Sequence, residues 1–332
     1  CVDYLCFGCE TDSIDLLNTV AEILINEPKE YKDLLTINLK TGISFPKARA
    51  KALDEYFKKY NLDYSPDINS KKYAKYPSDI TSNSNLDINT FINQPNNILG
   101  IEYIKALMRF NSKINPVPLK RLGAGYHSLD TRTKLASATG IRTAMANKDN
   151  ISGLLPDNCL NIIKNHTTIE YNDFSTVLGS KLLSMDTLDH IEGINQDLSN
   201  RIANNKYNFT DIETFIPMLQ SKNYTYSAIS RALLHIILDI KTDDIKEFIS
   251  NNYVNYAMIL GFNKNTGILS EINKYTKIPL VSKFATFYKE ADNNQRKMLD
   301  INLKADNLYR MIYMNKTSET LPTEFQRQII IK

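Results

Sequence analysis

The chain opens with an apolar run that is followed by an amphipathic pattern. Val2 to Phe7 predicts a buried strand ending at Gly8. Apolar residues at helical spacing then predict a helix that Asp12 or Ser13 caps: Ile14, Leu17, Val20, Ile23 and Leu24. Strand, glycine, acidic residue and helix in this order form a βα unit, and an open α/β sheet binds ligands at the carboxyl ends of such strands.

A second helix and strand are expected between residues 94 and 120. Pro95 ends the preceding segment, and Asn96 or Asn97 would cap the helix. Its apolar positions recur at helical spacing: Ile101, Ile104, Leu107 and Met108. The extended run 116–120 begins with Pro116 and also contains Pro118, which suits an edge strand because proline cannot donate to a ladder.

Other parts of the first half are a helix, a polar segment and a linker. Residues 46–59 predict a helix rich in Ala and Lys, whereas 61–93 are polar with little periodicity and predict a solvated loop or insertion. A further helix would begin at Ser137 to Thr139 and run to about Lys148. Because 151–156 resembles a linker, we expect two domains, 1–150 and 151–332.

The second half is dominated by helical patterns, at 159–165, 173–185, 194–204, 211–220 and 229–237. The helices on either side of the turn 221–224 would form a helix–turn–helix-like pair. A strand, a helix and a strand at 253–262, 269–275 and 278–282 predict a small βαβ unit. The predicted class is therefore α/β, with a mainly helical second domain.

Length, charge and cysteine content exclude few classes of protein. A chain of 332 residues can bury one or two cores, and no apolar run approaches the length of a membrane span. The formal net charge of +3 is too small to imply a strong field for polyanions. Four cysteines occur, at positions 1, 6, 9 and 159, and a lone Cys-x-x-Cys pair is a weak metal or redox signal. We expect reduced thiols, a cytoplasmic protein and no metal site.

Several polar residues stand at predicted element ends, where ligand chemistry is expected. Gly8 would let a ligand approach closely, or would simply make a turn. Arg121 follows the second strand and would pair with phosphate as a bidentate fork, or remain a solvated charge. A helix start with Ser137, Thr139 and Arg142 offers N–H groups, hydroxyls and a guanidinium to a phosphate.

His127 is a further candidate, as a general base. A histidine beside glycines more often orients a loop, so this assignment stays open.

The stretch from Gln94 to Arg142 resembles a known family. PNNILGIEYIKAL at 95–107, KRLGAGYH at 120–127 and SATGIR at 137–142 are similar to the bacterial tRNA(Met) cytidine acetate ligases, a branch of the HIGH-type nucleotidyltransferases. SATGIR resembles the Ile-Ser-Ser-Thr-x-Ile-Arg signature that holds ATP phosphates in that superfamily. The His-x-Gly-His element of the family would precede Cys1, so the resemblance implies a chain truncated at its N-terminus, with the catalytic histidines upstream.

The resemblance implies the C-terminal part of a Rossmann-like HIGH nucleotidyltransferase domain, followed by a mainly helical domain. It implies ATP, with Mg²⁺, bound at Gly8, Asn96, Arg121 and Leu122, and at the Ser137–Arg142 helix start. The reaction would join acetate to the wobble cytidine of elongator tRNA(Met) through an acetyl-adenylate. The truncated chain alone is expected to make no acetyl-adenylate.

For tRNA, the candidates are Lys222, Tyr224 and Arg231, with Tyr226 and Lys283. The family tends to carry more basic residues near Ala228, and an ordinary solvated helix end is the competing interpretation. Two other functions stay open: an adenylyltransferase acting on a small-molecule phosphate, and a non-catalytic RNA-binding module. The helical second domain argues against the first, and SATGIR argues against the second.

Overall fold

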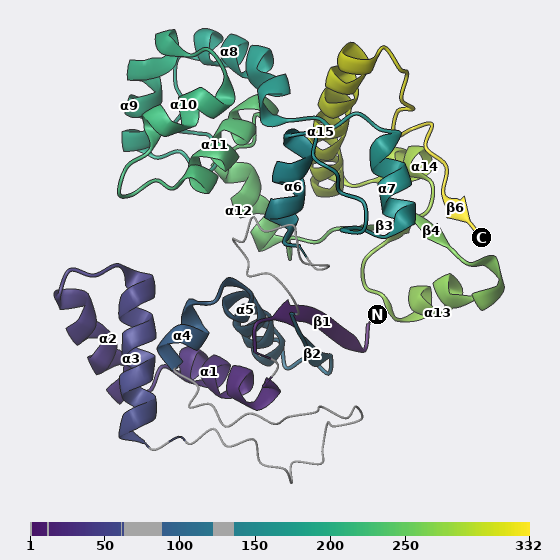
Figure 1. Ribbon diagram of the computed structural model, residues 1–332. Coiled ribbons are helices and arrows are strands. Elements are labelled where there is room, and N and C mark those ends of the chain that lie inside the picture. Colours follow the sequence, from purple (N-terminus) through teal and green to yellow (C-terminus); the bar gives the residue numbers. More distant parts are fainter. Residues whose placement is uncertain (1, 12, 61, 63–87, 122–135) are drawn as a thin grey trace. The chain divides into compact units, whose positions relative to one another are not determined.

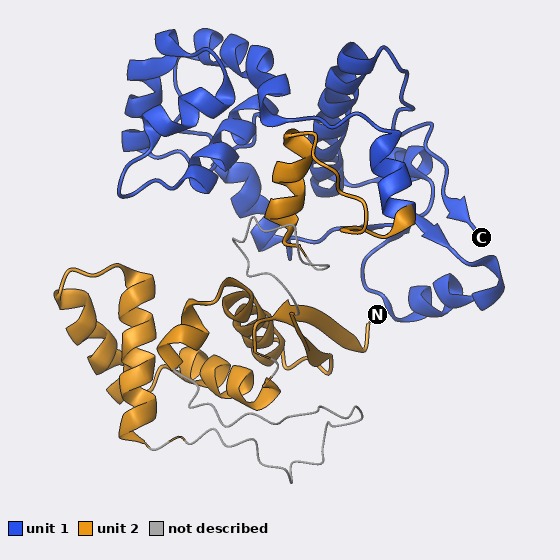
Figure 2. Ribbon diagram, viewed as in Figure 1, with its two compact units in different colours: residues 1, 158–332 blue, residues 2–157 orange. Residues whose placement is uncertain are grey.

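The computed structural model describes residues 2–11, 13–60, 62, 88–121 and 136–332. These fall into two compact units, an N-terminal unit of residues 2–157 and a C-terminal unit of residues 158–332 (Figure 2). Both units are mostly helical, and their strands form small parallel sheets (Figure 1). The expected α/β class therefore holds, with fewer strands than helices.

The N-terminal unit contains one pair of strands and helices around it. Its elements in chain order are β1 (Tyr4–Cys9), α1 (Ile14–Asn26), α2 (Lys29–Lys40), α3 (Phe45–Lys59), α4 (Ile88–Asn93), α5 (Pro95–Arg109), β2 (Asn115–Lys120) and α6 (Ala138–Ala146). β1 begins and ends two residues later than predicted, so Gly8 lies inside the strand rather than in a turn after it.

β1 and β2 are parallel, with Tyr4 opposite Asn115 and Cys9 opposite Lys120. The N–H of Asn115 donates to the Asp3 carbonyl at 2.9 Å, and the N–H of Arg121 donates to the Cys9 carbonyl at 2.8 Å. Since N–H groups alternate in direction along a strand, the even-numbered positions of β2 face away from β1. These positions include both prolines, and within the described residues β2 pairs with β1 alone, as the predicted edge strand requires.

Helix α5 packs directly against β1. A Cβ atom on Gly100 would lie only 2.5 Å from Cε2 of Phe7, so the close approach depends on glycine. Phe7 is buried, and its ring meets that of Tyr103 edge-to-face with centroids 5.7 Å apart. Helix α1 contributes Leu16 and Leu17 to the same core. This packing fixes the start of α5 beside the carboxyl end of β1.

Two local predictions for this unit need correction, and the structure decides a third that the sequence left open. Helix α5 begins at Pro95 with Gln94 as its N-cap residue, so neither Asn96 nor Asn97 caps it. The polar segment does not remain a loop as far as residue 93, because burial of Ile88, Phe91 and Ile92 stabilises α4. The cap of α1 is Ser13, whose Oγ accepts the Leu16 N–H at 3.4 Å, and Asp12 lies outside the described residues.

The C-terminal unit is a set of helices followed by a small βαβ arrangement. Its elements are α7 (Asp157–Lys164), η1 (Tyr171–Phe174), α8 (Ser175–Ser184), α9 (Gln196–Asn205), η2 (Lys206–Asn208), α10 (Ile212–Leu219), α11 (Tyr226–Leu238), α12 (Thr242–Ser250), β3 (Ala257–Met258), β4 (Gly261–Phe262), η3 (Lys264–Thr266), α13 (Ile268–Tyr275), β5 (Leu280–Val281), α14 (Phe284–Glu290), α15 (Asn293–Thr317) and β6 (Ile330–Ile331).

β3 and β5 are parallel and joined through α13, so the predicted βαβ unit is present. The predicted strand 253–262 is shorter than expected and divided into β3 and β4, and β4 pairs in parallel with β6. A second apolar core fills the space between α8 and α11, with Leu178, Phe215 and Ile236 fully buried.

Candidate functional site

The carboxyl ends of β1 and β2 bring two of the predicted ATP residues together. Gly8 is exposed, and a Cβ atom on it would lie 3.7 Å from Cγ of Arg121. That is an ordinary van der Waals distance, so packing against the described residues does not require glycine here. A glycine inside a strand without a packing reason marks a place where a ligand can approach the backbone. Gly8 and Arg121 thus form one small surface at the strand ends.

Asn96 reaches the same end of β1 from the first turn of α5. Its Nδ2 donates to Oε1 of Glu10 at 2.7 Å, and Glu10 directly follows the last residue of β1. The other carboxylate oxygen, Oε2, accepts the backbone N–H of Asn97 at 3.1 Å. Glu10 therefore caps α5 from another segment of the chain. An acidic group near a helix N-terminus is stabilising, because it meets free N–H groups and the positive end of the helix dipole.

Asn97 is a structural centre of this site that the sequence pattern did not reveal. Its side chain is fully buried, and Oδ1 accepts the backbone N–H groups of Glu10 and Thr11 at 3.0 and 3.3 Å. Its Nδ2 donates to the Phe91 carbonyl at 3.1 Å and to Oε1 of Gln94 at 2.7 Å. Every hydrogen-bonding position of the amide is used. Asn97 therefore ties the loop after β1 to the junction of α4 and α5.

The resemblance implied Asn96 as an ATP-binding residue, but the sequence offered Asn97 only as a possible helix cap and gave Glu10 no role. The available signal was an acidic residue immediately after a buried strand, which is a frequent position for site residues.

The predicted phosphate-binding helix start forms a second group, on α6. Ser137 is its N-cap residue and is buried, with Oγ accepting the Gly140 N–H at 2.9 Å. Thr139 is half-buried and Arg142 is exposed. The helix itself is confirmed, although it ends at Ala146 and not at Lys148. Residues 122–135, between Arg121 and this group, lie outside the described residues, and so do the candidates Leu122 and His127.

The two cysteines of the Cys-x-x-Cys pair are on one strand but in different surroundings. Cys6 is exposed, whereas Cys9 is fully buried and its Sγ lies 3.7 Å from the Leu119 carbonyl. Residues three apart on a strand project to opposite faces, so the two thiols do not share one site. Within the described ranges, no three His, Cys, Asp or Glu side chains gather as a metal site would require.

Four of the five tRNA candidates lie around the α10–α11 pair, whose two helices are confirmed, and Lys283 is the N-cap residue of α14. Ser221 and Tyr224 exchange backbone hydrogen bonds across the turn, at 3.4 and 3.2 Å. Lys222 in this turn and Arg231 on α11 are exposed. Tyr224 is half-buried, and its hydroxyl donates to Oδ1 of Asn195 at 2.6 Å. The additional candidates Tyr226 and Lys283 are also exposed.

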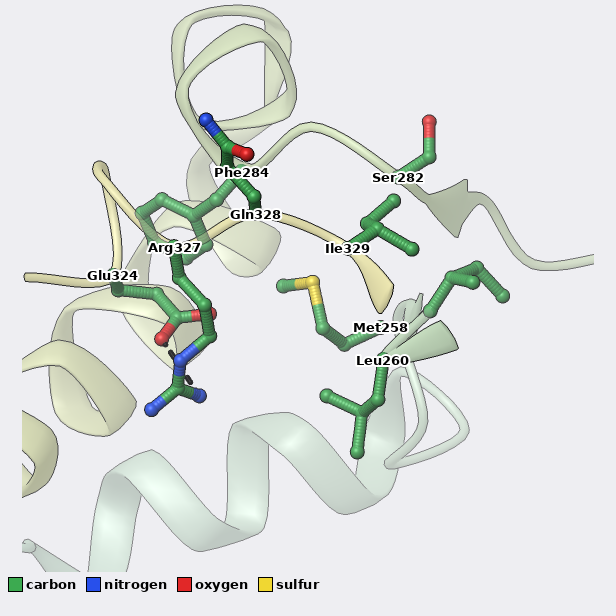
Figure 3. A pocket seen from close by; sticks show the side chains of 9 residues that line it. Met258, Leu260, Ser282, Phe284, Glu324, Arg327, Gln328 and Ile329 are labelled. Atoms are coloured by element: carbon green, nitrogen blue, oxygen red, sulfur yellow. Dashed lines mark ion pairs between the residues drawn. The ribbon is translucent and has the colours of Figure 1, made fainter. Parts of the chain in front are cut away.

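A cavity in the C-terminal unit is not a second nucleotide site. It lies beside β3 and β4, with the ion pair of Arg327 and Glu324 (3.1 Å) on one side and Met258 and Leu260 on the other (Figure 3). Its volume is about 30 Å³, which is the space of roughly one water molecule. A nucleotide does not fit there.

Comparison with known proteins shows the family to which the chain belongs. Residues 1–324 match the family described as HIGH Nucleotidyl Transferase. The tRNA(Met) cytidine acetate ligase of Halothermothrix orenii is 32% identical over 327 residues, which cover 94% of this chain and 73% of the relative. This chain belongs to the tRNA(Met) cytidine acetate ligase family.

Other members of the family give the same result. The tRNA(Met) cytidine acetate ligase of Acetivibrio thermocellus is 30% identical over 344 residues, covering 99% of this chain and 77% of the relative. The crystal structure of Thermotoga maritima TmcAL bound with alpha-thio ATP superposes with a TM-score of 0.78 at 25% identity, covering 99% of this chain and 76% of that one. Among the described helices, none combines the length and apolar character needed to cross a membrane.

Proposed function

We propose that this chain is part of an ATP-dependent ligase that forms N4-acetylcytidine at the wobble position of elongator tRNA(Met). Acetate is a poor acyl donor, because direct attack would have to expel oxide. An acetate oxygen attacks the α-phosphorus of ATP, which forms a P–O bond and releases pyrophosphate. The N4 amine of cytidine then attacks the acetyl carbon of the acetyl-adenylate, AMP leaves with the bonding electrons, and the amine loses a proton.

One observation carries the proposal: Gly8, Asn96 and Arg121 converge at one end of a parallel strand pair, in a member of this ligase family. These three residues match ATP-binding positions implied by the resemblance. The binding of alpha-thio ATP by the Thermotoga maritima protein supports ATP as the ligand here. Arg121 would supply a planar, permanently charged fork to a phosphate, and Gly8 would let the nucleotide lie against the backbone.

The α6 group would complete the phosphate contacts. The first turn of α6 has free N–H groups, and Thr139 and Arg142 add a hydroxyl and a guanidinium. Leu122 belongs to the same proposed ATP site. Stabilising the charge that develops on the phosphate needs several such donors in fixed positions.

Mg²⁺ would enter this site with the nucleotide. The described residues offer no cluster of three acidic, His or Cys ligands. Mg²⁺ commonly keeps several waters and binds substrate phosphates, so a dedicated protein cage is not needed.

Mass spectrometry of tRNA tests the product. In cells lacking the gene, N4-acetylcytidine should disappear from the wobble position of elongator tRNA(Met) and return when the gene is restored. Persistence of the modified base would contradict the proposal. Acetate-dependent exchange between ATP and pyrophosphate, measured on the natural gene product, tests the first step separately, because an adenylyltransferase acting on another substrate would show no acetate dependence.

A further inference from the structure

The contact between Glu10 and Asn96 determines which atom of Asn96 can meet a ligand. Nδ2 of Asn96 lies 2.7 Å from Oε1 of Glu10. A carboxylate accepts hydrogen bonds, so the part of the amide that faces it has to be the NH₂ group. The hydrogen-bond partner therefore decides which amide atom of Asn96 is the nitrogen and which is the oxygen. The carbonyl oxygen, Oδ1, lies on the other side of the amide.

Glu10 is itself held on several sides. Its backbone N–H is bound by Oδ1 of the buried Asn97, and its second carboxylate oxygen accepts the Asn97 backbone N–H. Both carboxylate oxygens therefore face donors on the first turn of α5. Turning the carboxylate away would leave the N–H of Asn97 without its acceptor, which is costly for a group at a buried residue.

The side of Asn96 away from Glu10 is available to a ligand. Asn96 is only partly buried, and no described residue donates a hydrogen bond to its Oδ1. An amide held in this way presents an acceptor and cannot rotate to present its NH₂ group. At the position of Oδ1, Asn96 can therefore bind a ligand group that donates a hydrogen bond, but not one that accepts it.

We propose that Glu10 is a positioning residue for ATP, which orients Asn96 so that its Oδ1 accepts a hydrogen bond from the nucleoside. The donor is either the exocyclic amine of adenine or a ribose hydroxyl. This inference rests on the proposed function, because it takes ATP as the ligand. The amine would make the site favour adenine over a base that carries a carbonyl oxygen at the same position.

Replacing Glu10 by glutamine should make Asn96 present a hydrogen-bond donor to the ligand in place of an acceptor. Glutamine has one acceptor oxygen, whereas Glu10 uses two. If that oxygen stays with the Asn97 N–H, the new NH₂ group faces Asn96, which then turns its own oxygen inward. Asn96 would present NH₂ to the ligand. The expected consequence is a change in selectivity between nucleotides, which a merely structural role of Glu10 would not produce.

The test is calorimetric binding of nucleotides to the natural gene product. The probes are ATP, purine riboside triphosphate without the amine, inosine triphosphate with a carbonyl oxygen, and 2′-deoxy- and 3′-deoxy-ATP. The wild type should bind at least one analogue about tenfold more weakly than ATP, as expected for one lost hydrogen bond. In Glu10→Gln this ratio should fall to about twofold or invert. Asn96→Ala should also lose the discrimination, while it keeps Glu10.

Asp15→Asn is the matched control, since it also removes one carboxylate from the first turn of a helix in the same unit. It should keep the wild-type ratios. Weak binding of the two base analogues identifies the amine as the donor, and weak binding of a deoxy analogue identifies a hydroxyl. Equal binding of all probes by the wild type, or unchanged discrimination in Glu10→Gln, would overturn the inference. If the wild type binds no ATP, the proposed function itself fails.

Discussion

At the scale of single residues, Arg121 is the charged side chain that stands beside the exposed backbone of Gly8. Arg121→Ala should weaken ATP binding by roughly 1.5–3 kcal/mol, about tenfold or more in Kd, because one charge-assisted hydrogen bond is lost. Calorimetry on the natural gene product measures this. Lys120→Ala is the control, since Lys120 is the preceding residue and projects to the other face of β2. Equal ATP affinity of wild type and Arg121→Ala would remove Arg121 from the site.

Asn97 has a different role, because its contacts are all within the protein. Asn97→Leu keeps the size of the side chain but leaves the N–H groups of Glu10 and Thr11 and the Phe91 carbonyl without their partner. We expect a loss of at least about 2 kcal/mol in the free energy of unfolding, since each unsatisfied buried group costs about 1–3 kcal/mol. Urea unfolding measures it. Asn93→Ala, at an exposed position of α4, should change stability little, and an equal loss there would contradict this account.

At the scale of elements, the contact of α5 with β1 depends on one glycine. Glycine to alanine normally stabilises a helix by roughly 0.5–1 kcal/mol. Gly100→Ala should instead destabilise the N-terminal unit by about 1–3 kcal/mol, because the added methyl group overlaps the Phe7 ring. Ala106→Gly, at an exposed position of α5, measures the propensity effect alone. A rise in melting temperature for Gly100→Ala would show that the ring moves aside at little cost.

The α10–α11 pair carries the proposed tRNA contacts. Lys222→Ala combined with Arg231→Ala should weaken tRNA binding and make its salt dependence shallower by about 1.5 in log–log slope, if both side chains neutralise phosphates. Filter binding at several salt concentrations measures this. The control double variant, Lys246→Ala with Lys274→Ala, also removes two exposed positive charges from the same unit. The same change in both double variants would indicate a general charge effect instead of a local contact.

Elements with a strong apolar period could be predicted from the sequence, and those with a sparse one could not. α1 and α11 repeat buried residues every three or four positions. α15 is 25 residues long but buries only Leu299, Leu303, Ile312 and Tyr313, so its pattern is weak. Its capping box, in which Asp292 and Gln295 bond each other's backbone, was the usable signal. α2 was missed for a similar reason, since its buried positions include the polar Asn38.

The residues of the candidate site also fall into those that the sequence could indicate and those that it could not. Gly8 and Arg121 stand at predicted element ends, and the resemblance to the ligase family implied these two residues and Asn96 as ATP-binding positions. The bonds of Glu10 and Asn97 join residues 86 and 87 positions apart in the chain, and a pattern in the sequence does not show such pairings.

At the scale of the whole C-terminal unit, Lys316 near the end of α15 binds Asp173 at 2.8 Å and also donates to the Thr168 carbonyl. Desolvation raises the pKa of Asp173, but the Glu170 N–H and the Lys316 ammonium together hold it below its ordinary value. The pKa of Asp173 is therefore lower in the folded protein than in the unfolded chain, where it is about 3.9. Its ionised carboxylate stabilises the fold at pH values above the unfolded pKa, and this stabilisation is lost as pH falls through the folded pKa.

Asp173→Asn should therefore cost about 1 kcal/mol or less at pH 7, and the difference from wild type should vanish well below pH ~4. Thermal unfolding across pH measures this difference. Asp243→Asn, which removes an exposed partner of Lys246, should show little effect at any pH. A difference that persists at the lowest pH would show that the Asp173 side chain acts through packing and not through its charge.

The two prolines of β2 also determine the direction in which this sheet can accept another chain. An unpaired strand edge is a template for association, because its free N–H and C=O groups can bind any extended peptide. On the outer edge of β2, Pro116 and Pro118 have no N–H to offer, so a foreign strand arriving there would find acceptors but no donors at two successive pairing positions. Edge-to-edge aggregation through the outer edge of β2 is thereby disfavoured. A strand that extends the sheet in register is therefore favoured beside β1 over the proline-bearing edge of β2.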